Sequence, residues 1–235
     1  NGWPLIGEDS DGDGVGEMVW EKPLPLPATD PVSLECRDDF SHTRLLPVWE
    51  WNHQPRDGKW SLTDHPGFLR LYAFPQLREG DFFTTGTVLS QRYVRWACGE
   101  ATSRFELTGM VDGQRAGLAH FNGGKDYACL EIRRDEGTLR LFFVRRYRDQ
   151  AIYEKELARL PRRIRRLDLR TTVDFNGKAV FAWSTDGRHF TTSKEEFELK
   201  WGNYRGDRIG LYTFHAAREA GFVDIDRFDY NRRQY

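Results

Sequence analysis

The 235-residue sequence lacks the features that mark several large classes of protein. No apolar run approaches the roughly 18 residues that a membrane-spanning helix needs. Only three cysteines are present, and their odd number and wide spacing exclude a full disulfide framework and fit no zinc motif. We expect Cys98 and Cys129, which lie in apolar stretches, to be small buried side chains rather than reactive thiols.

The sequence also lacks an excess of charge of either sign. Charged residues make up 30% of the chain, yet the formal net charge is only −1. Nucleic acids and anionic membranes attract clustered positive charge, so we expect neither as a partner. The arginine-rich segment 161–167 is more typical of a solvated loop that leads into a strand than of a binding patch.

Motifs for independent catalysis are missing as well. There is no nucleophile elbow, no P-loop and no HExxH motif, and the six histidines show no spacing that favours zinc. A glycosidase needs two carboxylates across a cleft, about 5 Å or 6.5–9.5 Å apart. Glu131 with Asp135, and Asp224 with Asp226, are the candidate pairs, but Arg133 lies between the first two. We therefore expect the chain alone not to be an enzyme.

The composition changes twice along the chain. The sequence begins Asn-Gly-Trp-Pro, with neither an initiator methionine nor a signal peptide, so we expect a processed or excised piece of a longer protein. Residues 1–21 form a leader rich in Gly and Asp, and residues 22–33 form a proline-rich linker that favours an extended conformation. Residues 34–235 are long enough for one large β domain.

Short alternating or apolar runs between turn signals fill this third segment. Asn176-Gly177 is a strong signal for a two-residue hairpin. The one helix-like stretch, 194–199, is short. The pattern predicts an all-β sandwich of two antiparallel sheets. The expected strands are 47–51, 67–73, 87–94, 102–110, 115–121, 126–134, 138–147, 150–158, 165–174, 179–185, 208–214 and 221–230.

Aromatic side chains make up 14% of the sequence, and the segment 49–73 concentrates them. Trp49 and Trp51 are two residues apart, so on a strand they face the same side of the sheet. Asn52 and His53 follow directly. Paired aromatic rings flanked by amide and imidazole groups suit a sugar ring, which is apolar on its faces and polar at its rim. The alternative is that the tryptophans, with Trp60, close one end of the sandwich core.

The same segment carries a resemblance to a known family. Its residues WEWNHQP, KWSL and GFLRLYA resemble the opening strands of the C-terminal concanavalin-A-like domain of family 43 glycoside hydrolases, which are β-xylosidases and arabinofuranosidases. The leader GWPLIGEDSDGDGVGE (2–17) resembles the last stretch of that family's catalytic propeller. Further matches keep the family's order: RDDF (37–40), GQRAGLAHFNGGKDYACLEI (113–132), IGLYTFH (209–215) and DIDRFDY (224–230).

The resemblance implies a fold, a ligand and a partner. The fold would be a concanavalin-A-like β-sandwich, classed in the family as a xylan-binding module, and the partner would be the catalytic propeller. The family's catalytic carboxylates belong to the propeller, so none is carried over. A loop of this domain narrows the mouth of the family's active site, and Tyr204 occupies the corresponding place, although Asn203-Tyr204-Arg205 departs from the usual pattern.

Two places could hold a structural calcium ion. Asp9, Asp11 and Asp13 copy the start of a calcium loop, but Trp20 replaces the glutamate expected at its twelfth position and Glu17 falls at its ninth. Many β-sandwich carbohydrate modules instead hold calcium between their first and last strands. The matching residues here are Asp38 or Asp39 with Asp224 or Asp226, and we select Asp39 and Asp226.

Three functions remain open at this point. The first is a non-catalytic domain that binds xylan or xylo-oligosaccharides and helps to shape the active site of a parent enzyme. The second is a purely structural domain, and the third is an independent glycosidase. If the tryptophans belong to the core, the binding site must be sought among His53, Phe121, Asn122 and Tyr204.

Overall fold

The computed structural model describes residues 7–18, 36–93, 98–123, 125–148, 150–200, 202 and 206–233. The chain divides into two compact units, residues 1–33 and 34–235. The linker predicted at 22–33 lies outside the described residues. In the described part of the leader, Glu8 and Glu17 pair across a short antiparallel bridge. No described helix is long and apolar enough to cross a membrane.

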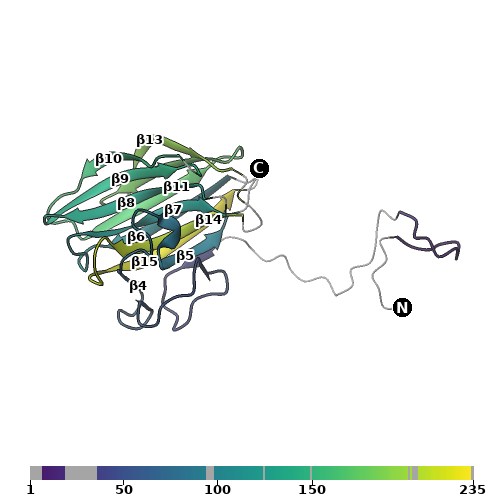
Figure 1. The fold of residues 1–235 in the computed structure, drawn as a ribbon, viewed down its shortest axis with the longest axis horizontal. Helices are drawn as coiled ribbons and strands as arrows, with labels where there is room; N and C mark the ends of the chain where they lie inside the picture. Colours follow the sequence, from purple (N-terminus) through teal and green to yellow (C-terminus); the bar gives the residue numbers. More distant parts are fainter. Residues whose placement is uncertain are drawn as a thin grey trace. The chain divides into compact units, whose positions relative to one another are not determined.

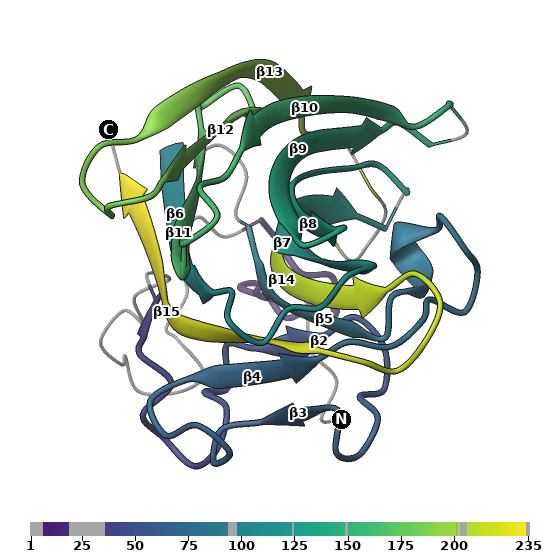
Figure 2. The same ribbon diagram turned by 90° about the vertical axis from the view of Figure 1, so that its left-hand side faces the viewer.

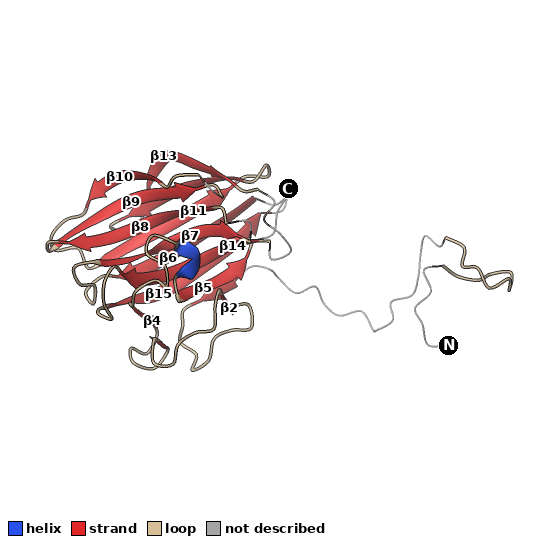
Figure 3. Cartoon of the chain, viewed as in Figure 1, coloured by secondary structure: helices blue, strands red, loops and turns tan. Residues whose placement is uncertain are grey.

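The second unit contains two antiparallel sheets (Figures 1 and 3). Within the described residues the first sheet has eight strands in the order β13-β12-β11-β6-β15-β4-β3, with β1 paired to β15. These strands are β1 (Cys36–Asp38), β3 (Trp60–Ser61), β4 (Leu69–Tyr72), β6 (Cys98–Glu106), β11 (Arg166–Val173), β12 (Lys178–Ser184), β13 (Thr191–Glu198) and β15 (Phe222–Arg233).

The second sheet has seven described strands in the order β10-β9-β8-β7-β14-β5-β2. Almost every residue of its central strands β7 and β14 is buried, polar residues included, because both of their faces are covered. Its strands are β2 (Glu50–Trp51), β5 (Thr87–Arg92), β7 (Gln114–Asn122), β8 (Tyr127–Asp135), β9 (Thr138–Arg146), β10 (Tyr153–Arg159) and β14 (Asp207–His215).

The main hydrophobic core lies between the two sheets, which Figure 2 shows as two layers. Successive side chains of a strand point to opposite faces, so Leu118 on β7 and Leu211 on β14 enter this core while Phe121 and Tyr212 point away from it. The outward-pointing side chains form a second apolar cluster on the outer face of the second sheet.

A short 3-10 helix, η1 (Phe82–Thr84), covers this outer face. In Figure 2 it lies on the opposite side of the β7–β8–β14 layer from β6 and β11. The Phe82 ring contacts those of Phe121, Tyr127 and Tyr212 at centroid distances of 5.5, 4.8 and 5.2 Å. The side chain of Asp81 caps the helix by accepting a hydrogen bond from the Phe83 N–H. The second sheet is therefore buried on both faces near η1 and open to solvent beside it.

Most of the predicted strands are present with shifts of a few residues at their ends, and the all-β sandwich of two antiparallel sheets is confirmed. A hairpin joins β11 to β12 at Asn176-Gly177, but its loop is longer than the two residues predicted. Residues 174–177 separate the strands, the Gly177 N–H donates to the Asp174 carbonyl at 3.0 Å, and Gly177 has a positive φ of 84°. The arginine-rich segment 161–167 begins in an exposed turn and leads into β11.

The helix-like reading of residues 194–199 is wrong. Residues 191–198 form β13, which pairs with β12 so that Phe197 lies opposite Ala179. Ser193 and Phe197 are buried while Lys194 and Glu196 are exposed, and this alternation fits an edge strand. The pairing and burial of Phe197 outweigh the helix propensity of the Lys-Glu-Glu sequence, because propensity is a weak preference per residue.

Candidate functional site

The three tryptophans of the segment 49–73 pack in or against the main core. Trp49 is 8% exposed and its ring lies 5.8 Å from that of Phe40 and 4.9 Å from that of Phe228. Its indole N–H donates a 2.7 Å hydrogen bond to the carboxylate of Asp38. The half-buried rings of Trp51 and Trp60 lie 5.3 Å apart and border the same core. Trp49 and Trp51 therefore face the same side of the sheet, as their spacing predicts, but this side is the one that faces the main core.

A recess of about 180 Å³ opens at the edge of the outer face of the second sheet. It brings together four of the residues that the sequence singled out for sugar binding, from two separate segments. They are Asn52 and His53 after β2, and Phe121 and Asn122 at the end of β7. We call this the edge recess, and its lining residues are Asn52, His53, Phe83, Phe121, Asn122, Gly123, Lys125 and Arg208.

The walls of the edge recess are held by specific contacts. The Nε2 atom of the exposed His53 forms a hydrogen bond with the carbonyl oxygen of Phe83. Asn122 is buried, donates to the carbonyl of Lys200 at 3.0 Å and accepts from the N–H of Asp126 at 3.1 Å. A side chain on Gly210 would meet the Phe121 ring at 2.8 Å, so the glycine makes room for that ring. Aromatic and amide groups are therefore fixed before any ligand arrives.

Gly202, one described residue of the segment that the resemblance links to the active-site mouth, lies beside this recess. Tyr204 lies outside the described residues. Its neighbour Gly202 packs so closely on Asn122 that a Cβ atom there would lie 2.2 Å from the amide carbon. Gly202 therefore packs against a wall of the edge recess.

Besides Gly123, sequence reasoning missed three residues that line the recess. Phe83 belongs to η1, Lys125 to the turn between β7 and β8, and Arg208 to the start of β14. Lys125 lies inside the matching segment 113–132 and Arg208 directly precedes the segment 209–215, so both could have been found by extending those segments. Nothing in the local sequence connects Phe83 with the site, since η1 reaches it only through the fold.

A second pocket, of about 160 Å³, lies over the middle of the same outer face. We call it the central pocket. Its floor holds Glu131 of β8, which receives hydrogen bonds from Arg133 Nε at 2.7 Å and from the Tyr212 hydroxyl at 3.0 Å. Arg133 also donates two hydrogen bonds to Glu154, at 2.9 and 2.7 Å. Two glutamates thus share one guanidinium group.

The electrostatics of the central pocket oppose acid catalysis. Hydrogen bonding to Arg133 lowers the pKa of Glu154, although its partial burial works in the other direction. A general acid needs a raised pKa instead. Asp135, the partner proposed for Glu131, forms a 3.0 Å ion pair with Arg140 at the end of β8. The second candidate, Asp224, is bound by Arg70 through two 2.7 Å hydrogen bonds.

The acidic residues at the two ends of the sandwich also have protein partners. The buried Asp38 accepts from Trp49 and from the N–H of Phe40 at 2.8 Å. Asp39 is exposed and accepts from Ser41 N–H at 3.0 Å, while Asp226 lies 3.4 Å from an Nη atom of Arg104. Asp224 contacts His65 Nδ1 at 2.8 Å in addition to Arg70. A calcium ion between Asp39 and Asp226 stays a prediction, and these partners would compete with it.

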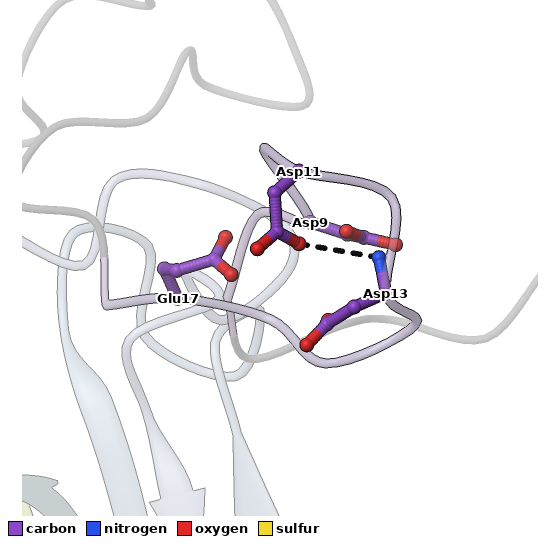
Figure 4. A group of neighbouring side chains, drawn as sticks. All are labelled: Asp9, Asp11, Asp13 and Glu17. Carbon is purple, nitrogen blue, oxygen red and sulfur yellow. Dashed lines mark hydrogen bonds between the residues drawn. The ribbon is translucent and has the colours of Figure 1, made fainter.

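The leader gathers more acidic groups than the sandwich ends do. Among the described residues, one group of carboxylates has oxygens within 4.8 Å of one another, and Figure 4 shows its members Asp9, Asp11, Asp13 and Glu17. The N–H groups of Gly12 and Gly14 donate to Asp9 at 2.6 and 2.9 Å. Hydrogen bonds from Ser10 lower the pKa of Glu17. Oxygen ligands at this spacing suit calcium, so calcium binding stays a prediction here too.

The cysteines fit a structural role, with one difference from the expectation. Burial raises the pKa of the Cys129 and Cys36 thiols, which makes them poor nucleophiles. Cys98, predicted to be buried, is only partly covered at the start of β6. All three are free.

The chain is similar to known β-xylosidases over almost its whole length. Residues 37–231 match the family model of the β-xylosidase C-terminal concanavalin-A-like domain. A β-xylosidase of Formosa agariphila is 33% identical over 98% of this chain, which covers 41% of that protein. A putative β-xylosidase of Escherichia coli is 27% identical over 98% of the chain and 44% of its own length. The chain thus spans about two fifths of the curated relatives that it matches.

Solved structures share the fold. An engineered family 43 glycoside hydrolase with endo-xylanase and exo-arabinofuranosidase activity superposes with a TM-score of 0.78 at 23% identity, over 96% of this chain and 46% of that one. A xylan β-1,4-xylosidase of Bacillus halodurans gives a TM-score of 0.73 at 17% identity, over 88% of this chain and 41% of that one. In both, the matching part is less than half of the solved chain.

Proposed function

Because the chain belongs to the family of β-xylosidase C-terminal concanavalin-A-like domains, we propose that it is an accessory domain that binds xylan or xylo-oligosaccharides for a family 43 catalytic domain. The observation that carries the proposal is the edge recess. There the fold joins Asn52, His53, Phe121 and Asn122, which sequence reasoning had linked to sugar binding before the fold was known.

The chemistry of the edge recess suits a single sugar unit. Its volume of about 180 Å³ is below the range of about 300–1,000 Å³ that holds drug-sized ligands, so it fits one ring rather than a chain of rings. The rings of Phe83 and Phe121 supply apolar walls, and the imidazole of His53 supplies a polar group at the exposed rim. A pyranose needs both kinds of surface.

The position of the recess supports a role in the parent enzyme. The loop that approaches the active-site mouth in the family runs past Gly202, whose backbone touches Asn122 of the recess. A substrate chain that occupies the recess could therefore continue toward the propeller. In this proposal, Tyr204 narrows the mouth and the edge recess holds the next part of the chain.

We also propose that the chain has no glycosidase activity of its own. Glu131 and Glu154 of the central pocket bind the same guanidinium group, and the pKa of Glu154 is lowered. A lowered pKa favours the ionised form of Glu154, whereas cleavage of a glycosidic bond requires a protonated carboxylic acid. Incubation with aryl xylosides, xylobiose and xylan should release no sugar above the buffer control. Turnover that survives repurification and disappears in Glu131→Ala would contradict this.

A purely structural domain is the second candidate, and the burial of Trp49 favours it. Affinity electrophoresis in gels with and without soluble xylan separates the two, with mixed-linkage glucan as the control polysaccharide. We expect xylan to retard the chain. His53→Ala should weaken binding roughly three- to tenfold, because one hydrogen bond contributes about 0.5–1.5 kcal/mol. The matched control is His42→Ala, an exposed histidine outside the recess, which should leave the retardation unchanged.

Each result decides between the candidates. Equal mobility of the chain in gels with and without xylan would favour the structural domain. Retardation that both histidine variants retain would move the binding site away from the edge recess.

A further inference from the structure

The edge recess is lined by two cationic side chains and by no carboxylate. The central pocket, on the same face of the sheet, is lined by glutamates as well as arginine. A neutral pentose has no need of an unbalanced positive charge. The positive charge of the recess therefore favours an anionic ligand, whereas the aromatic and amide groups would suit any sugar.

Arg208 supplies the first of these charges from the floor. Its side chain is 3% exposed, and its Nη1 atom lies 2.7 Å from a carboxylate oxygen of Glu50. Arg92 binds the other oxygen of Glu50 at 3.0 Å, so one carboxylate serves two guanidinium groups. The buried Nε of Arg208 has no hydrogen-bond acceptor among the described residues. Positive charge therefore remains beside the recess, where low polarity strengthens its field.

Lys125 supplies the second charge from the rim. It is exposed and forms no ion pair with any described carboxylate. The neighbouring Asp126 is buried and accepts a 2.6 Å hydrogen bond from Arg148 N–H, so its charge is held within the turn. Lys125 has a φ of 68°, in the left-handed region that glycine and asparagine adopt more readily. A strained lysine at the rim of a pocket is a feature that function can explain.

We propose that the edge recess binds the carboxylate of a hexuronic acid, such as one carried as a side group on a xylan chain. The carboxylate lies toward Arg208 and Lys125, the sugar ring contacts Phe83 and Phe121, and a hydroxyl reaches His53. This inference rests on the proposed function and narrows it, since the accessory domain then selects acidic xylan over neutral xylan.

The test compares three oligosaccharides by isothermal titration calorimetry. They are a xylo-oligosaccharide with one glucuronic acid branch, the same compound with its carboxyl group reduced to an alcohol, and the unbranched neutral xylo-oligosaccharide. Reduction removes the charge and keeps the shape. We expect the acidic compound to bind about fivefold more tightly than its reduced form at low salt, as a partly screened ion pair would give, and this preference to shrink as salt is added.

One variant removes the rim charge. Lys125→Asn should abolish most of the preference, and asparagine tolerates the left-handed backbone at this position. Lys194→Gln, on the exposed face of β13, is the matched control and should keep the preference.

The outcomes separate this inference from the proposed function. Equal affinity for the acidic and reduced compounds would overturn the uronic acid site and leave the xylan-binding domain intact. A preference that Lys125→Asn retains in full would also overturn the site. Failure of all three compounds to bind would remove both proposals.

Discussion

The central pocket and the edge recess open on the same face of the second sheet and treat charge in opposite ways. In the central pocket, Glu131 and Glu154 share the guanidinium group of Arg133 through hydrogen bonds of 2.7–2.9 Å, and Arg115 lies 3.5 Å from Glu131. In the edge recess, Arg208 shares the carboxylate of Glu50 with Arg92, and Lys125 pairs with no carboxylate among the described residues. The central pocket looks more like an active site by its carboxylates, but its groups are already satisfied.

This difference shows how to weigh charged residues in a pocket. A buried ion pair whose members complete one another contributes structure, and removing one member leaves an uncompensated charge. A cationic group with no full partner can gain by binding an anion.

Replacing Arg133 by methionine should destabilise the fold by roughly 3–5 kcal/mol, because Glu131 is then buried without its partner. Urea unfolding measures the change. Arg140→Met is the matched control on the neighbouring strand, since its ion pair with Asp135 is half-exposed and should contribute no more than about 1 kcal/mol. A loss of xylan binding by Arg133→Met in its folded state would show that the central pocket, rather than the edge recess, holds the sugar.

Trp49→Ala should also cost roughly 3–5 kcal/mol, as expected for a core aromatic residue. It leaves a cavity beside Phe40 and Phe228 and removes the indole donor of Asp38. Under conditions where the variant stays folded, its retardation by xylan should be normal. If the variant keeps the melting temperature of the parent chain and loses xylan binding, Trp49 is a binding residue after all.

The layer between the sheets offers a comparison with a third kind of buried group. His120 is 1% exposed, contacts Tyr93 and Phe181, and bonds the Thr171 hydroxyl at 2.8 Å. Burial lowers its pKa from 6.5 to about 3. The unfolded chain therefore binds one more proton between these values, and stability falls as the pH drops below 6.5.

The slope in that window is about 1.4 kcal/mol per pH unit for one proton. Between pH 6.5 and pH 5 we expect His120 to account for about 2 kcal/mol of lost stability. Urea unfolding of the parent chain and of His120→Gln at both pH values isolates this part, because the other titrating groups are common to both chains. Parallel losses in the two chains would exclude His120 as the cause.

The smallest effect is expected from chelation of calcium. Excess EDTA should shift the melting temperature of the sandwich by no more than about 2 °C, which corresponds to less than about 1 kcal/mol. Asp38, Asp224 and Asp226 already have protein partners. A larger fall, reversed by added calcium, would establish an ion at Asp39 and Asp226 that stabilises the native state by mass action.

Calcium binding by the leader is a separate measurement. Isothermal titration with calcium chloride should show an exchangeable ion that Asp9→Asn weakens, without a matching change in the melting of the sandwich. The absence of binding heat at millimolar calcium would count against a leader site.

The sequence was enough to predict the fold class and most of the strands, because alternation and turn residues such as Asn176-Gly177 act locally. The sequence was not enough to identify the strand at 191–198, because residues 194–199 read as a short helix. The strand became evident only from the pairing of Phe197 with Ala179. Edge strands with charged exposed faces give a weak signal. Their identity depends on pairing with a neighbouring strand, here β12, and on the burial of alternate side chains.

The site was predictable only in part, for a physical reason. Asn52, His53, Phe121 and Asn122 could be named because they lie in conspicuous segments. Whether Trp49 faces a sugar or the core depends on which sheet face is covered, and alternation alone gives parity without giving direction. Phe83 enters the recess only through the packing of η1, so no local pattern could assign it.

The most direct test of the account is the location of the sugar on the chain. Amide chemical shifts of the ¹⁵N-labelled protein can be followed by NMR as the acidic xylo-oligosaccharide is added. We predict that the changes gather at Asn52, His53, Phe83 and Lys125, around the edge recess. Changes centred on Glu131 and Glu154, or no changes at all, would contradict it.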